Sequence, residues 1–296
     1  MNTQEMTDRI ASGQGFIAAL DQSGGSTPKA LRGYGVDDSE WSGDEEMFAA
    51  IHAMRARVIT APSFGGGKVI GAILFERTMD GLVDGVPTAE ALKQRGVVPF
   101  IKVDEGLQDE RAGVQLMKEM SKLDALLKKS VAAGMFGTKM RSVIKSANPE
   151  GIAAAVAQQF EYGARIANAG LMPILEPEYD IKAPDRAEGE EILLSELLRH
   201  LDALPHGRKV MLKLSIPATP GLYAPLIAHP AVLRVVALSG GYSTEDACAH
   251  LARNKGMIAS FSRGLLQDLR KGQSDAEFDA ALARAIDAIH AASVAG

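Results

Sequence analysis

Residues 209–214 of the chain read Lys209-Val210-Met211-Leu212-Lys213-Leu214. The run is apolar without alternation, which is typical of a strand covered on both faces, as in a parallel sheet. Lys213 is unusual there, because lysine is seldom fully buried without a partner. A lysine in apolar surroundings tends to lose its charge, and a neutral amine can form a Schiff base with a ketone. Taken alone, the segment still favours a strand-end lysine whose side chain reaches solvent.

Seven other apolar runs occur along the chain, and helical patterns separate most of them. The eight runs cover residues 16–20, 69–75, 97–103, 136–141, 171–175, 210–214, 233–238 and 257–261. Each unit averages 37 residues (296/8), which suits a strand, a helix and two loops. Alternating strands and helices imply a parallel sheet with right-handed crossovers. The sequence therefore predicts an α/β fold, a (β/α)₈ TIM barrel forming one domain over residues 1–296.

An open doubly wound sheet is the alternative fold. The residues after the first run, Asp21-Gln22-Ser23-Gly24-Gly25-Ser26, do not form the GxGxxG fingerprint of dinucleotide-binding sheets. Helix signals between the runs fit either fold. An apolar stripe at residues 116, 120, 123 and 127 predicts one helix, and Asn148-Pro149 predicts the start of another. Ser243 and Ser274 each precede an acidic residue by three positions, as in a capping box.

Composition excludes several classes of partner. The net charge of −5 and pI near 5.7 argue against nucleic acid and against an anionic membrane. No apolar run approaches the roughly 20 residues that cross a bilayer, and the N-terminus lacks a secretory pattern. A single cysteine, Cys248, permits no internal disulfide and fits a cytoplasmic setting. The sequence does not set the oligomeric state, so a homo-oligomer stays open.

Polar residues follow nearly every apolar run, at the barrel end where chemistry is expected. These residues are Asp21, Lys102, Lys139, Arg141, Glu176, Glu178, Lys213, the Ser239-Gly240-Gly241 segment, and Ser262, Arg263 and Gly264. The cations would form a basic bowl in an acidic protein, where neighbouring ammonium groups lower each other's pKa. The carboxylates would supply proton donors and acceptors.

Two small loops could hold anions on opposite sides of this bowl. Ser239-Gly240-Gly241 comes just before the predicted helix start at Ser243, where backbone N–H groups can bind a phosphate. Ser23 and Ser26 flank two glycines in a second loop. A glycine-rich loop alone is more often a tight turn, but two of them beside a basic bowl favour a ligand with phosphate at both ends. The residues thus indicate a Schiff-base enzyme acting on a phosphorylated carbonyl compound.

The same residues carry a resemblance to a known family. The motifs in chain order are DQSGGS at 21–26, IKVD at 101–104, KMR at 139–141, PILEPE at 173–178, LKLSIPATPG at 212–221, LSGGYS at 238–243 and FSRG at 261–264. In this combination and order the chain resembles the class I, Schiff-base, fructose-bisphosphate aldolases, in their short bacterial form. The resemblance spans residues 15–264.

The resemblance implies a role for each candidate residue. Lys213 would form the Schiff base with fructose 1,6-bisphosphate, and Glu176 would act as general acid and base. Asp21 would handle the proton of the C4 hydroxyl, Lys139 would supply positive charge beside Lys213, and Glu178 would orient the cations. The C1 phosphate would bind at Ser239, Gly240 and Gly241. The C6 phosphate would bind at Ser23, Ser26, Lys102 and Arg141.

The sequence departs from the longer eukaryotic members of the family at two places, and both affect the roles that the resemblance implies. Those members read FSYGR after the eighth strand, with a phosphate-binding arginine after the glycine, whereas here Arg263 precedes Gly264. We expect Ser262, Arg263 and Gly264 to serve a phosphate from a shifted position. The chain also ends without the terminal tyrosine of those relatives, so another group or water would protonate the enamine.

Some alternatives to this function keep the Schiff-base chemistry, and others do not. An aldolase acting on tagatose 1,6-bisphosphate or on a single-phosphate keto sugar would also keep Lys213, and a non-catalytic sugar-phosphate-binding barrel could lose it. A zinc-dependent class II aldolase needs three metal ligands, and the six histidines form no HExxH or HxH pair. The resemblance therefore implies no cofactor and no metal, with sugar phosphates as the ligands.

Overall fold

Eight parallel strands form a barrel in the computed structural model, which describes residues 1–295. The barrel strands are β1 (Phe16–Leu20), β2 (Val69–Leu74), β5 (Val98–Lys102), β7 (Gly137–Ile144), β8 (Met172–Tyr179), β9 (Val210–Ser215), β10 (Val232–Leu238) and β11 (Ile258–Ala259). They pair in this order from β1 to β11. A hydrogen bond from Ala19 N–H to the Phe261 carbonyl, at 3.3 Å, joins the two ends. All eight predicted strands and the (β/α)₈ fold are confirmed.

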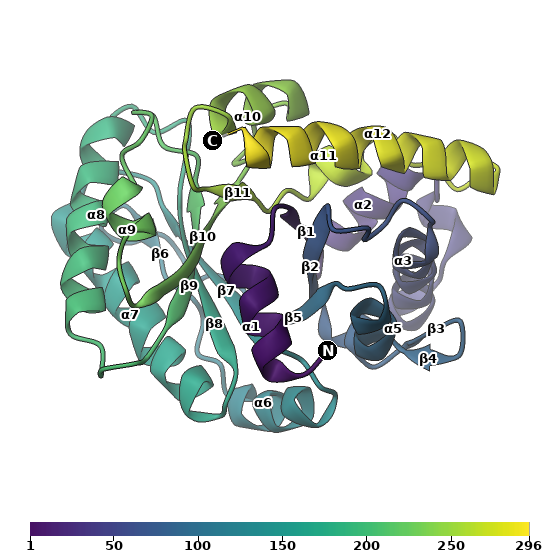
Figure 1. Cartoon of the computed structure of the whole chain (residues 1–296), viewed down its shortest axis with the longest axis horizontal. Coiled ribbons are helices and arrows are strands. Elements are labelled where there is room, and N and C mark those ends of the chain that lie inside the picture. The colour runs from purple at the N-terminus through teal and green to yellow at the C-terminus, as the bar shows by residue number, and fades with distance from the viewer. Residues whose placement is uncertain (296) are drawn as a thin grey trace.

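Helices surround the strands (Figure 1). They are α1 (Thr3–Ser12), α2 (Ser26–Tyr34), α3 (Gly43–Thr60), α4 (Glu76–Met79), α5 (Thr88–Gln94), α6 (Leu123–Ala132), α7 (Pro149–Asn168), α8 (Arg186–Asp202), α9 (Ala224–Ile227), α10 (Thr244–Leu251), α11 (Arg263–Leu266) and α12 (Asp275–Val294), with a 3₁₀ turn at Asp38–Glu40. The predicted caps are present: Asn148 and Ser243 accept hydrogen bonds from Gly151 and Asp246, and Ser274 forms a capping box with Glu277. Over residues 1–295 no helix is both long and apolar enough to span a bilayer.

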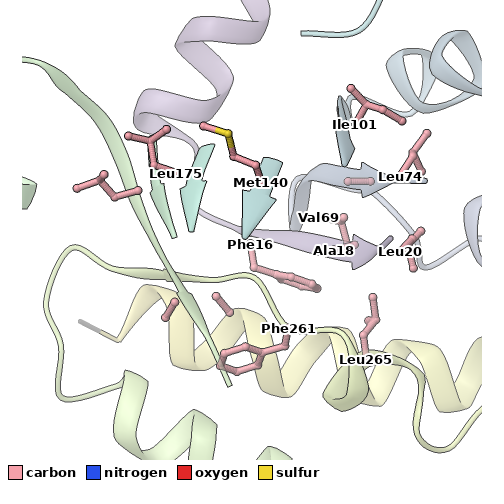
Figure 2. Close-up of a cluster of buried hydrophobic side chains, with 14 of the residues drawn as sticks. Phe16, Ala18, Leu20, Val69, Leu74, Ile101, Met140, Leu175, Phe261 and Leu265 are labelled. Atoms are coloured by element: carbon pink, nitrogen blue, oxygen red, sulfur yellow. The ribbon is translucent and has the colours of Figure 1, made fainter. Parts of the chain in front are cut away.

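Two apolar layers build the barrel, because side chains alternate between the inside and the outside of each strand. The outer layer packs beneath the helices, and Figure 2 shows part of it, with Phe16, Ala18 and Leu20 on one face of β1 and Phe261 and Leu265 beside the C-terminal helices. The inner layer includes Ile17, Ile73, Phe100, Ile174 and Met211.

Helix α1 closes the amino-terminal end of the barrel. Its Met6 and Ile10 belong to the inner apolar cluster, and Ile10 is fully buried. In Figure 1 the purple helix lies across the front of the strands. Together with the inner side chains of the strands, α1 forms a closed apolar plug at the amino-terminal end of the barrel. Polar chemistry is therefore restricted to the opposite, carboxyl-terminal end.

The predicted helix over residues 116–127 is wrong for its first half. Helix α6 begins only at Leu123, and the preceding stretch is irregular apart from the short strand β6 (Val114–Gln115), which pairs antiparallel with β7. Side chain Gln158 of α7 binds both the N–H and the carbonyl of Met117, at 2.8 and 2.9 Å. These bonds replace the helical ones. A separate two-residue hairpin pairs β3 (Leu82–Val83) with β4 (Val86–Pro87).

Candidate active site

The site is placed by the alternation of side chains along the barrel strands. Glu176 and Lys213 come two residues after the inward-facing Ile174 and Met211, so they point into the barrel one layer above the plug. The register pairs Ile174 with Met211, which brings Glu176 and Lys213 alongside one another. Lys139 of β7 pairs in register with Ile174, and its side chain reaches Glu176 from there. Lys139, Glu176 and Lys213 are each only 4% exposed.

One carboxylate links the two buried lysines. Glu176 Oε1 lies 3.1 Å from Lys213 Nζ, and Glu176 Oε2 lies 3.1 Å from Lys139 Nζ. Asp21, after β1, extends the array, with its Oδ2 at 2.6 Å from Lys139 Nζ. The structure therefore brings four of the five predicted catalytic residues into one connected set of ion pairs.

Two members of this set, Lys139 and Asp21, have pKa values shifted by their neighbours. Burial disfavours an ammonium at Lys139, but Asp21 and Glu176 raise its pKa above the ordinary value. Burial would also raise the pKa of Asp21, but Lys139 and Lys213 hold it well below its usual range. In the resting site at neutral pH, Lys139 is therefore a cation and Asp21 an anion that is able to accept a proton.

Glu178, the fifth predicted residue, lies one layer farther out, at the rim. Its Oε2 is 2.9 Å from Arg141 Nε. Burial raises the pKa of Glu178, and Arg141 opposes the rise. The prediction that Arg141 ends the fourth strand is wrong, since β7 continues to Ile144 and pairs with β8 along its whole length. Arg141 is nevertheless exposed toward the mouth, because it follows Lys139 by two residues.

The predicted anion loops lie at the same end of the barrel. Gly240 and Gly241 have φ angles of +60° and +114°, which non-glycine residues rarely adopt. A Cβ on Gly240 would come within 2.8 Å of Ile181, so the tight loop requires glycine there. The Arg263 guanidinium lies beside the loop, 3.8 Å from where a Cβ of Gly241 would be. The shifted arginine thus reaches the loop after β10.

The loop after β1 is locked by its own serines. Ser23 N–H donates to Ser26 Oγ at 3.0 Å, and Ser26 Oγ donates to the Ser23 carbonyl at 2.8 Å. A cavity of about 630 Å³ opens beside it, between this loop, Lys102 and the start of α6. Lys102 Nζ binds Asp104 Oδ1 at 2.8 Å, so Asp104 holds this lysine at the cavity wall. Asp104 is the last residue of the IKVD motif at 101–104, and the motif alone predicted no role for it.

Residues 1–295 contain no group of three His, Cys, Asp or Glu side chains placed to hold a metal ion. What the mouth does contain is a buried lysine–carboxylate–lysine array between glycine-rich loops, at the carboxyl end of a (β/α)₈ barrel. This arrangement is typical of enzymes in which a lysine amine forms a Schiff base with a carbonyl compound.

Comparisons with known proteins agree with this class. A family model, glycolytic fructose-bisphosphate aldolase class-I, matches residues 3–186. The class 1 fructose-bisphosphate aldolase of Porphyromonas gingivalis is 53% identical over 292 residues, which cover 98% of this chain and 99% of the relative. The chain therefore belongs to the class I fructose-bisphosphate aldolase family.

Solved structures support the fold. The fructose-bisphosphate aldolase of Plasmodium falciparum, solved with TRAP and a small-molecule inhibitor, matches with a TM-score of 0.77 at 20% identity, over 99% of this chain and 95% of that one. A protein of Corynebacterium glutamicum matches with a TM-score of 0.52 at 13% identity, over 98% and 92% of the two chains. At these identities the likeness concerns the fold alone.

Proposed function

We propose that this chain cleaves fructose 1,6-bisphosphate reversibly into dihydroxyacetone phosphate and glyceraldehyde 3-phosphate through a Schiff base on Lys213. The observation that supports it most is the Glu176 carboxylate held 3.1 Å from both Lys213 and Lys139 in a buried layer. Such a carboxylate can take a proton from one amine and return it to an oxygen, which amine addition to a carbonyl requires. The family's glycolytic role and the single Cys248 favour a cytoplasmic setting.

The steps follow from this arrangement. Glu176 takes a proton from Lys213, the resulting neutral amine adds to the C2 carbonyl, and a proton moves from the nitrogen to the new oxygen to give a carbinolamine. Glu176 then returns its proton to the departing hydroxyl, so that water leaves and an iminium forms. The C3–C4 bond then breaks, and its electron pair moves into the iminium to give an enamine. The C4 hydroxyl loses its proton to Asp21 as glyceraldehyde 3-phosphate forms. Protonation of the enamine and addition of water release dihydroxyacetone phosphate and restore the amine.

Lys139 and Glu178 would act through charge. Lys139 stays cationic because Asp21 and Glu176 surround it. A fixed cation in a site of low dielectric stabilises negative charge that develops on oxygen. Glu178 anchors Arg141 at the rim, so that the guanidinium faces the incoming phosphate.

The two phosphates would occupy the two loops. Ser239, Gly240 and Gly241 offer backbone N–H groups near the α10 N-terminus, and Arg263 adds a guanidinium beside them. Ser262 and Gly264 would contribute to the same phosphate site. Ser23, Ser26, Lys102 and Arg141 would hold the second phosphate at the cavity between the loop after β1 and α6.

Borohydride reduction in the presence of dihydroxyacetone phosphate tests the proposal. The iminium would be reduced to a stable secondary amine, and peptide mapping should find the added mass on Lys213. An adduct on any other lysine would overturn the assignment. Lys213→Met should abolish cleavage, since Lys139, the other amine beside Glu176, is held as a cation by Asp21 and Glu176 and cannot replace it; turnover within tenfold of wild type would contradict this.

A further inference from the structure

Arg55 of α3 is a buried cation that the proposed chemistry does not use. Its side chain is fully buried. Its hydrogen bonds within the described residues all go to uncharged oxygens: Gln22 O at 2.5 Å, Gln22 Oε1 at 3.2 Å and Thr78 Oγ1 at 2.7 Å. A buried charge without an ionic partner is costly. Burial lowers the pKa of Arg55 to about 10, and Asp21 opposes the fall. A group kept at such a cost calls for an explanation beyond packing.

The first contact of Arg55 orients a peptide group. Gln22 stands between Asp21 and Ser23, and Arg55 Nη2 binds its carbonyl. In a planar trans peptide the carbonyl and the following N–H point in opposite directions. The Ser23 N–H is therefore turned away from Arg55 and toward Ser26, whose hydroxyl it meets at 3.0 Å. Arg55 thus sets the peptide on which both serines of this loop depend.

The second contact runs through the Gln22 side chain. Arg55 is only a donor, so the Gln22 oxygen must face it and the Gln22 amide nitrogen must face the other way. That nitrogen donates to the Ala19 carbonyl at 3.2 Å and to Ser262 Oγ. The bridge from Gln22 to Ser262 crosses the seam between β1 and β11. It connects the loop after β1 to the loop that carries Arg263.

We propose that Arg55 and Gln22 are positioning residues for the phosphate that the proposed function assigns to Ser23 and Ser26, so this inference rests on that function. Arg55 holds the turn formed by residues 23–26 in its binding geometry through the Gln22 carbonyl. Gln22 connects that turn to the loop that contains Ser262. Neither side chain contacts substrate. Their loss should weaken recognition of the C6 phosphate more than it weakens the carbonyl chemistry at Lys213.

Two substrates separate this role from a general structural one. Fructose 1-phosphate carries the C1 phosphate and the ketone but lacks the C6 phosphate. Arg55→Lys keeps the charge and loses the fork that reaches Gln22 and Thr78 together. We expect the ratio of kcat/KM for fructose 1,6-bisphosphate over fructose 1-phosphate to fall about tenfold, mainly through a higher KM for the bisphosphate. Gln22→Met, which leaves Arg55 in place, should lower the ratio by a smaller factor.

Arg57→Met is the matched control. Arg57 lies on the same helix but binds away from the site, to Asp275 at 3.0 Å and to the Gln273 carbonyl at 2.6 Å. It should lower thermal stability without changing the substrate ratio. An unchanged ratio in both Arg55→Lys and Gln22→Met, or an equal loss with both substrates, would overturn the inference. If wild-type protein forms no borohydride adduct at Lys213, the proposed function itself fails, whereas a wild-type adduct with unaltered variant ratios defeats only the inference.

Discussion

Glu176 serves two lysines with one carboxylate, and this makes it the most sensitive residue of the site. Its two oxygens contact different ammonium groups, so a change at this position disturbs both partners. Glutamine keeps the size and one acceptor oxygen but cannot carry a proton between amine and hydroxyl. Substitution of Glu176 by glutamine therefore tests proton transfer at this residue while its size is kept.

Glu176→Gln should lower kcat by about 10²- to 10⁴-fold, the usual contribution of general acid–base catalysis. KM for fructose 1,6-bisphosphate should change less, because both phosphate loops are intact. Glu178→Gln is the comparison, since Glu178 pairs with Arg141 at the rim and should lose less activity. Steady-state kinetics on both variants measure the difference. A Glu176→Gln enzyme within tenfold of wild type would exclude the assigned role.

Lys139→Met should alter how stability depends on pH. In wild type Asp21 has a pKa held below its ordinary 3.8, so its stabilising contribution is present above 3.8 and is lost as pH falls through the lowered pKa. Without Lys139, burial raises the Asp21 pKa, and the variant gains stability as pH falls. The difference in unfolding free energy between the two proteins should therefore be largest at neutral pH and narrow between about pH 5 and pH 3.

Urea unfolding at several pH values measures this difference. The control is Lys129→Met, which removes an exposed lysine paired with Glu76 and Asp80. Its stability should stay within about 0.5 kcal/mol of wild type across the range. A Lys139→Met deficit that grows as pH falls would contradict the linkage to Asp21.

At the scale of elements, α1 and the strands share the work of closing the barrel. Helix α1 supplies Met6 and Ile10 to the inner cluster, where they meet apolar side chains of the strands. This plug lies at the end of the barrel opposite the site, so its contribution is to stability rather than to chemistry. The short strand β11 is supported instead by α12, whose Ser293 Oγ accepts from Ala259 N–H at 3.0 Å.

Ile10→Ala should lower the free energy of unfolding by about 2–5 kcal/mol, because it removes a fully buried side chain and leaves a cavity. The borohydride adduct on Lys213 should still form in the folded variant. Leu82→Ala is the control, since Leu82 is 57% exposed and should cost little. Denaturant titration of both variants provides the measurement, and equal stabilities would show that α1 does not act as a plug.

At the scale of the whole molecule, a net charge of −5 coexists with a cationic mouth. Lys102, Lys139, Arg141, Lys213 and Arg263 belong to one end of the barrel, so the binding of a bisphosphate depends on local charge rather than on the overall field. The same mouth holds the Lys213 amine, from which the electron-accepting iminium of the proposed mechanism would form.

Prolonged incubation with EDTA should leave the rate of fructose 1,6-bisphosphate cleavage unchanged. The iminium on Lys213 would take the electrons that a metal ion accepts in zinc-dependent aldolases. Addition of Zn²⁺ after EDTA should restore nothing, since nothing was lost. A fall in activity with EDTA that Zn²⁺ reverses would contradict the Schiff-base mechanism.

Much of the fold and the membership of the site could be predicted from local patterns. Apolar runs identified all eight strands, because residues buried on both faces need not alternate, although the fourth run, residues 136–141, is only weakly apolar. Polar residues after those runs predicted which side chains meet at the mouth, since parallel strands place their carboxyl ends together. Arg55 also left a signal, as a charged residue four positions after Ile51 and three before Val58 in the buried stripe of α3.

Only the tertiary structure determined which side chains of the site pair with one another. The division of Glu176 between two lysines and the pairing of Arg141 with Glu178 depend on the register and closure of the barrel, which join strands that are distant in sequence. The start of α6 depends on Gln158, supplied by another helix. Sequence periodicity reports only which face of a segment is buried. Which atoms meet across the barrel is fixed by how the strands align, and that turned Lys213 from an odd strand lysine into the partner of Glu176.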